Sequence, residues 1–124
     1  MFNILVVDDQ AHIRRLYEYT LEKNGYQPFT AGDGAEALRL MENTHIDLVI
    51  LDLMMPTMDG LRAAKEIRAL PRADAQSVAI IAVTANAFSD DIRQAIAAGM
   101  NEHIGKPVDS DKLVEMLLKY KKSK

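Results

Sequence analysis

Short apolar runs alternate with helix-patterned stretches from one end of the chain to the other. Five such runs occur, at residues 2–7, 26–31, 47–51, 78–83 and 102–105. Each is followed by a stretch in which apolar residues recur every three or four positions, as on one face of an α-helix. Because right-handed crossovers between parallel strands place helices on both sides, this alternation predicts an α/β domain with a five-stranded parallel sheet between two helical layers.

The runs differ in how strongly they indicate a buried strand. Residues 47–51 and 78–83 are almost continuously apolar, which is typical of strands covered on both faces. Residues 26–31 form a weaker pattern. Pro28 predicts that this strand lies near an edge of the sheet, because proline has no N–H to donate.

The sequence predicts beginnings and ends for the helices, and residues that share one helix face. Asp33 and Glu36 have the spacing of a capping box, which predicts a helix running to about Asn43. Another helix is expected over about 61–70. Further caps and stops are expected at Asn24-Gly25, Ser89, Gly99 and Asp109. One face of the first helix is expected to carry Ile13, Leu16, Tyr17, Thr20 and Leu21, and one face of the last helix Leu113, Met116, Leu117 and Tyr120. The helix that begins at Ser89 carries Ile92, Ala95 and Ile96.

Composition narrows the class of protein. The 124 residues suit one domain, with a frayed tail expected at 121–124, and the absence of cysteine excludes disulfides and thiolate metal sites. The longest apolar run is too short for a membrane span, and no signal peptide is visible. A net charge of −3 gives no electrostatic argument for a nucleic-acid partner. We therefore expect a small soluble cytoplasmic domain that binds neither membrane nor nucleic acid.

Polar residues follow four of the expected strands. They are Asp8, Asp9, Asp52, Thr84 and Lys106. Taken singly, an aspartate or threonine at such a position is often a helix cap or turn former, and a lysine a surface charge. However, the carboxyl ends of parallel strands meet at one edge of the sheet, where ligands bind in such folds. The pattern therefore predicts one shared site.

The residue types at this site indicate phosphoryl chemistry. Three clustered carboxylates repel one another unless a cation lies between them, and oxygen ligands without histidine or cysteine suit Mg²⁺. Asp52 could act as a nucleophile that forms an aspartyl phosphate. Mg²⁺ and Lys106 would offset the charge of the phosphoryl oxygens, and the Thr84 hydroxyl would donate to one of them.

These residues also carry a resemblance to a known family. Asp8-Asp9, Asp52 with Pro56 and Asp59-Gly60, Thr84-Ala85, and Lys106-Pro107 resemble, in order and approximate spacing, the motifs of response regulator receiver domains. The similarity covers essentially the whole chain. It implies the flavodoxin-like, doubly wound (βα)5 fold with strand order 2-1-3-4-5.

The resemblance implies a role for each acidic residue. Asp52 would be the phosphoacceptor, taking a phosphoryl group from a phosphohistidine on a histidine kinase or a histidine phosphotransfer domain. Asp9 and Asp52 would bind Mg²⁺ directly. Asp8 would act largely through water, and the backbone carbonyl of Met54 would complete the protein ligands.

The resemblance also implies how phosphorylation is sensed. Thr84 and Lys106 would bind the phosphoryl oxygens, and the peptide bond before Pro107 would be cis. His103 stands where the family commonly has a tyrosine or phenylalanine that moves with the threonine. It is therefore either a switch residue together with Thr84 or an exposed polar residue on an edge strand. Val108 likewise replaces a frequent phenylalanine.

Three functions remain open from the sequence. The first is a phosphorylation-controlled switch, either stand-alone or part of a longer protein, that acts by binding an unidentified protein. Residues 84–87 and 98–101 resemble receivers attached to hybrid kinases. The second is a Mg²⁺-dependent phosphohydrolase, although Met54 occupies the position where such enzymes often have an acid/base aspartate. The third is an interaction module that is not phosphorylated. His12 and His45 lack partners at metal-ligand spacing and are expected at the surface.

Overall fold

A computed structural model describes residues 2–54, 59–85 and 89–122 of the chain. The strands are β1 (Asn3–Val7), β2 (Gln27–Ala31), β3 (Leu48–Asp52), β4 (Ala79–Thr84) and β5 (Glu102–Gly105). The helices are α1 (Ala11–Lys23), α2 (Gly34–Asn43), α3 (Gly60–Arg68), α4 (Ser89–Ala97) and α5 (Ser110–Lys122). Strand and helix alternate throughout, as the sequence predicted.

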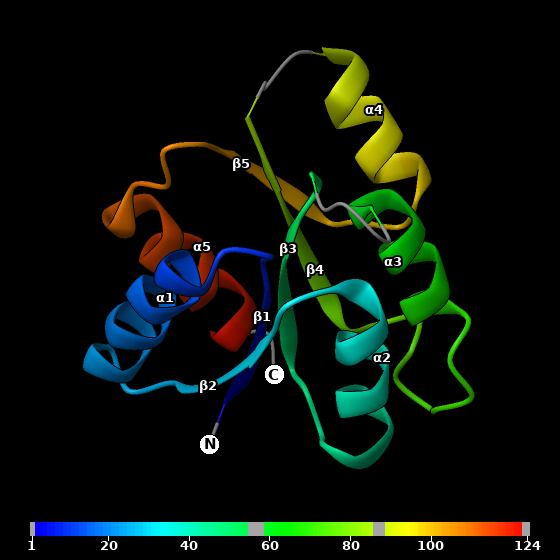
Figure 1. Cartoon of the computed structure of the whole chain (residues 1–124), viewed down its shortest axis with the longest axis horizontal. Helices are drawn as coiled ribbons and strands as arrows, with labels where there is room; N and C mark the ends of the chain where they lie inside the picture. The colour runs from blue at the N-terminus through cyan, green and yellow to red at the C-terminus, as the bar shows by residue number, and fades with distance from the viewer. Residues whose placement is uncertain (1, 55–58, 86–88, 123–124) are drawn as a thin grey trace.

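The strands form one parallel sheet in the order β2-β1-β3-β4-β5. Helices α1 and α5 cover one face, and α2, α3 and α4 cover the other (Figure 1). The doubly wound fold and its strand order are therefore confirmed. β2 lies at an edge, as Pro28 indicated, and the inner strands β3 and β4 are buried along their whole length.

Two apolar layers hold the helices on the sheet. Alternate residues of a strand point to opposite faces, so β1 contributes Ile4 to the α1/α5 layer and Leu5 to the α2/α3/α4 layer. Two apolar residues of the expected helices, Leu16 and Ile96, are each 61% exposed. Each lies next to a buried helical residue, Tyr17 or Ala95, and the rotation of about 100° between consecutive residues turns it away from the sheet.

The local helix signals are largely confirmed. The Asp33 carboxylate accepts from the Glu36 N–H at 2.8 Å, while the Glu36 carboxylate accepts from Gly32 rather than from the capping residue itself. Gly99 ends the α4 segment at φ +99°, a backbone conformation that glycine adopts without strain. Helix α5 extends to Lys122, so residues 121 and 122 of the expected frayed tail are helical.

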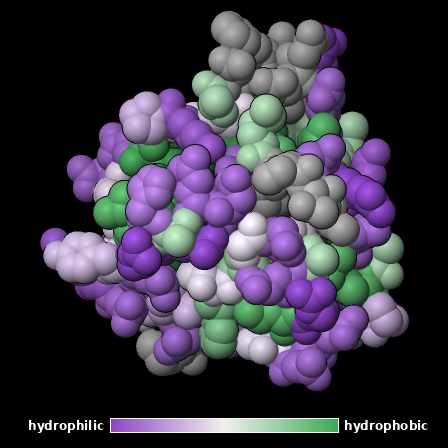
Figure 2. All heavy atoms as spheres, viewed as in Figure 1, coloured by the Kyte–Doolittle hydropathy of each residue, from purple (hydrophilic) through white to green (hydrophobic). Residues whose placement is uncertain are grey.

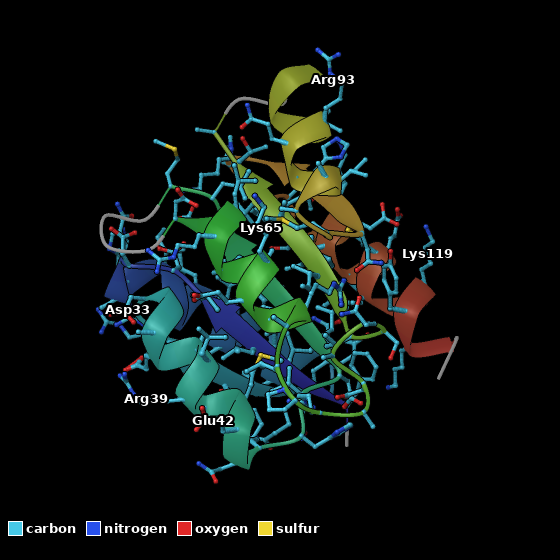
Figure 3. All side chains as sticks on the ribbon, turned by 90° about the vertical axis from the view of Figure 1, so that its right-hand side faces the viewer. Asp33, Arg39, Glu42, Lys65, Arg93 and Lys119 are labelled. Carbon is cyan, nitrogen blue, oxygen red and sulfur yellow. The ribbon has the colours of Figure 1, made fainter. Side chains whose placement is uncertain are left out.

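The outer helix surfaces are charged. Arg39 and Glu42 on α2 and Lys65 on α3 point away from the sheet (Figure 3). Within the described ranges, no helix is both long and apolar enough to span a bilayer. His12 and His45 are exposed, as expected, although His45 bonds the Asp47 carboxylate at 2.8 Å.

Candidate functional site

The ends of four strands bring the predicted site residues to one edge of the sheet. Asp8 directly follows β1 and Lys106 directly follows β5. Asp52 and Thr84 are the last residues of β3 and β4, rather than the first residues after them. Because all strands run in parallel, these ends meet at the same edge, seen in the upper part of Figure 1.

Three carboxylates form the acidic part of this site. One oxygen from each of Asp8, Asp9 and Asp52 lies within 4.8 Å of the others. Asp8 and Asp52 are each only 3% exposed, whereas Asp9 is exposed to solvent. Among the described residues, no other group of three or more histidine, aspartate or glutamate side chains lies this close together.

Lys106 and two backbone amides hold these carboxylates. The Lys106 ammonium lies 3.2 Å from both oxygens of Asp52. The Met54 N–H donates to Asp52 Oδ1 at 3.0 Å, and the Gln10 N–H donates to Asp8 Oδ1 at 2.9 Å. Asp52 is therefore a buried carboxylate that is paired with a cation and fixed in orientation.

The carboxylates nevertheless interact unfavourably with one another. Burial raises the pKa of Asp8, and although the Gln10 N–H opposes this change, the charge of Asp52 raises the pKa further. A divalent cation between the carboxylates would remove this penalty. The donor set consists of oxygens alone, which fits a hard cation such as Mg²⁺.

The backbone packs tightly around Asp52. The Leu53 N–H donates to the Val83 carbonyl at 3.0 Å, which ties the end of β3 to β4. The Gly60 N–H donates to the Leu53 carbonyl at 3.1 Å. A Cβ atom on Gly60 would lie 2.6 Å from the Asp52 carbonyl oxygen, so only glycine allows this approach.

Two further contacts place the loops on either side. The Lys106 N–H donates to the Thr84 carbonyl at 2.9 Å, and the Lys106–Pro107 peptide bond is cis, as expected. From α1, the Arg14 guanidinium donates to the Asp8 carbonyl at 2.7 Å. Arg14 was not among the predicted site residues, although an arginine six residues after an acidic strand end is near enough in the chain to contact the site.

Thr84 and His103 occupy different surroundings. Thr84 is buried at the end of β4, with 4% of its surface exposed. His103 is exposed on the edge strand β5 and faces away from the α1/α5 layer, because its neighbour Ile104 packs into that layer. His103 and Lys106 both line an open groove of about 690 Å³, whose other lining residues come from β5, the loop after it and α5. The switch role of Thr84 and His103 stays a prediction.

A second hollow opens beside the carboxylates, between α1 and the segment from Lys106 to α5. Its volume is about 340 Å³, and Asp8 and Lys106 line one part of it. The remaining walls are mostly apolar and include Leu16, Tyr17 and Val108. Figure 2 shows apolar surface among the hydrophilic atoms on this α1/α5 side. The sequence pattern placed Tyr17 on one face of a helix and did not predict its position at this cavity.

Some expectations lie outside the described residues. Pro56 of the Asp52 loop and residues 86–87 of the stretch that resembles hybrid-kinase receivers belong to this group. Met54 is the last described residue before residues 55–58, and it is 71% exposed. The use of its carbonyl as a metal ligand stays a prediction.

Comparison with known proteins gives a consistent picture. The family model described as "Response regulator receiver domain" matches residues 4–118. Sensor histidine kinase RcsC of Escherichia coli (strain K12) is 40% identical over 117 residues, which are 94% of this chain but 12% of that protein. Sporulation initiation phosphotransferase F of Bacillus subtilis (strain 168) is 35% identical over 94% of this chain and 91% of its own length.

Solved structures show the same likeness. The receiver domain of sensor histidine kinase PA1611 from Pseudomonas aeruginosa PAO1 is 34% identical, with a TM-score of 0.86 and 96% of each chain covered. That structure holds a magnesium ion coordinated in its active site cleft. The chain thus spans nearly all of some relatives and about an eighth of the RcsC kinase.

Proposed function

This chain belongs to the response regulator receiver domain family and is a phosphoacceptor module of two-component phosphorelay signalling, and we propose that Asp52 is its phosphoacceptor. We also propose that residues 1–124 form a single receiver domain. The observation that carries this proposal is the state of Asp52. Its carboxylate is buried at a strand end, lies 3.2 Å from Lys106 and shares an acidic cluster with Asp8 and Asp9.

Each residue of the site then has a chemical task. An oxygen of Asp52 attacks the phosphorus of the donor and forms an aspartyl phosphate, while the bond from phosphorus to the donor nitrogen breaks and its electron pair stays on that nitrogen. Asp8, Asp9, Asp52 and the Met54 carbonyl would hold Mg²⁺, which when bound offsets negative charge on the phosphoryl oxygens. The Lys106 ammonium offsets more of this charge, and the Thr84 hydroxyl donates a hydrogen bond to a phosphoryl oxygen.

The donor in this proposal is a phosphohistidine on a histidine kinase or a histidine phosphotransfer domain. This choice rests on the kinase relatives and on the apolar cavity beside Asp8 and Lys106, which an incoming donor protein can cover. Because the kinase draws its phosphoryl group from ATP, we place the exchange in the cytoplasm. The modified domain then acts by binding a further protein, with neither nucleic acid nor membrane as its partner.

Turnover of a metabolite is the weaker alternative. A phosphohydrolase of this chemistry needs a proton-transferring group near the nucleophile. The side chain two residues after Asp52 is the exposed thioether of Met54, which carries no such proton. We therefore propose a signalling module with slow self-dephosphorylation rather than a metabolic enzyme.

Intact-mass spectrometry tests the proposal. The protein is incubated with phosphoramidate, with and without Mg²⁺, beside the variants Asp52→Asn and Asp59→Asn. Asp59 is a matched control, because asparagine also caps helices well and the residue lies outside the carboxylate cluster. We expect one added phosphoryl group in the wild type and in Asp59→Asn, only with Mg²⁺, and none in Asp52→Asn. An adduct that persists in Asp52→Asn would overturn the assignment.

A further inference from the structure

Tyr17 brings a phenol side chain to the wall of the cavity beside the phosphoacceptor site. The side chain comes from α1, is 7% exposed and lines the cavity of about 340 Å³ that Asp8 and Lys106 also line. Within the described residues its hydroxyl forms no hydrogen bond, yet every fully buried side-chain polar atom there has a partner. The hydroxyl is therefore not fully enclosed by protein atoms, and this cavity is the opening that Tyr17 lines.

The charge around this hydroxyl keeps it protonated. Burial raises the pKa of Tyr17, and the negative charges of Asp8 and Asp52 raise it further. The phenol is therefore a neutral hydroxyl across the physiological range of pH, able both to donate and to accept a hydrogen bond.

The surroundings of Tyr17 restrict what can fill the cavity well. Ile13, Leu16, Val108 and Leu113 supply apolar walls. A purely apolar group would displace water from the hydroxyl and replace it with nothing, which is unfavourable. A group with apolar faces and one hydrogen-bonding atom would satisfy both the walls and the hydroxyl. An imidazole ring has this character, because its second nitrogen remains available when the first carries a phosphoryl group.

We propose that the Tyr17 hydroxyl binds the second ring nitrogen of an imidazole phosphodonor, which makes Tyr17 a specificity-determining residue for phosphoryl groups carried on imidazole. The inference rests on the proposed function. In the transfer, an Asp52 oxygen forms the new P–O bond while the P–N bond breaks and its electron pair stays on the ring nitrogen. The second nitrogen keeps its proton and donates to the Tyr17 oxygen, so the ring leaves as neutral imidazole.

Two small donors with the same type of bond test this contact. Phosphoimidazole carries the ring, whereas phosphoramidate breaks a P–N bond but has no ring to place in the cavity. The rate constant kcat/KM for phosphorylation with Mg²⁺ is measured for the wild type, Tyr17→Phe and Tyr19→Phe. Tyr19 is a matched control, because it lies on the same helix and is 66% exposed.

In Tyr17→Phe we expect kcat/KM for phosphoimidazole to fall about fivefold, the effect of one ordinary hydrogen bond, and the value for phosphoramidate to change less than about twofold. Tyr19→Phe should leave both values unchanged. A structural defect would lower kcat/KM for both donors together. Equal losses with the two donors, or no loss with phosphoimidazole, would therefore overturn the inference. If the wild type accepts a phosphoryl group from neither donor, the proposed function fails as well.

Discussion

At the scale of single residues, Gly60 tests whether backbone packing supports the chemistry of Asp52. A Cβ atom at Gly60 would lie 2.6 Å from the Asp52 carbonyl oxygen and 2.7 Å from the Leu53 Cα. Both are backbone atoms that cannot move without shifting the end of β3. We expect Gly60→Ala to lower the free energy of unfolding by about 3 kcal/mol, as overpacking does. Urea unfolding measures this change, and calorimetry should show weaker Mg²⁺ binding.

Gly32→Ala serves as the comparison for that prediction. The nearest atom to a Cβ at Gly32 belongs to the flexible Arg14 side chain, at 3.4 Å. We therefore expect a change within about 0.5 kcal/mol. Equal stability of the two variants would show that the backbone near Asp52 is free to adjust.

The residues of the site were predictable from sequence to different degrees. Asp8, Asp52 and Lys106 were identified because each stands at a strand end, and the topology alone brings strand ends together. Arg14 and Tyr17 were not identified, because they reach the site from within α1. Their positions depend on how that helix packs on the sheet, which the periodicity of apolar residues does not specify.

At the scale of elements, Arg68 joins α3 to the segments before β4 and β5. Its guanidinium donates to the Gly99 carbonyl at 2.6 and 2.9 Å and to the Val78 carbonyl at 2.6 Å. It also bonds the Ala75 carbonyl and the Asn101 side chain. All these partners are neutral, so Arg68 acts as a fork of directed hydrogen bonds rather than as half of an ion pair.

Replacing Arg68 should therefore loosen one end of the α4 segment. We expect Arg68→Ala to cost about 3 kcal/mol of folding stability, because several carbonyls lose their donor. Hydrogen exchange should rise at residues 71–78 and 97–101. Arg62→Ala removes only an exposed pair with Glu66 at 3.8 Å and should cost less than about 0.5 kcal/mol. Similar losses in both variants would contradict the role given to Arg68.

The order and type of the elements followed from the sequence more closely than their packing did. Alternation and period identified every strand and helix in its place along the chain. However, the same period could not decide the width of the buried helix face, since Leu16 and Ile96 belong to the apolar pattern although both are exposed. Helical periodicity defines a direction toward the sheet, while burial also depends on where the neighbouring helix ends.

At the scale of the whole molecule, stability and function are located in different parts of the fold. The two apolar layers cover the middle of the sheet and contain its fully buried side chains. The carboxyl edge instead gathers acidic groups, of which Asp8 and Asp52 are buried together. Because a bound cation would stabilise only the folded arrangement of these groups, the metal should couple this edge to global stability.

This coupling predicts a dependence on pH. The pKa of Asp8 is raised in the folded state, so the contribution of this group to the stability of the metal-free protein falls as pH rises above about 4. Protons and Mg²⁺ compete for the same carboxylate. At pH 7 and about 100 times its Kd, Mg²⁺ should add about 2.7 kcal/mol to the free energy of unfolding, and this gain should shrink on acidification toward pH 4.

Thermal unfolding is measured for the wild type and Asp8→Asn, with and without Mg²⁺, at pH 7 and at pH 4. The comparison separates the cost of the Asp8 charge in the metal-free protein from the contribution of Asp8 to Mg²⁺ binding. Asparagine keeps an oxygen that can accept from the Gln10 N–H but removes one of two buried, neighbouring charges. The metal-free variant should therefore have a higher Tm than the metal-free wild type at pH 7 and gain less from Mg²⁺. An equal gain in both proteins would mean that Asp8 takes no part in binding the metal. If the stabilisation by Mg²⁺ persisted undiminished at pH 4, protonation of Asp8 would not compete with metal binding.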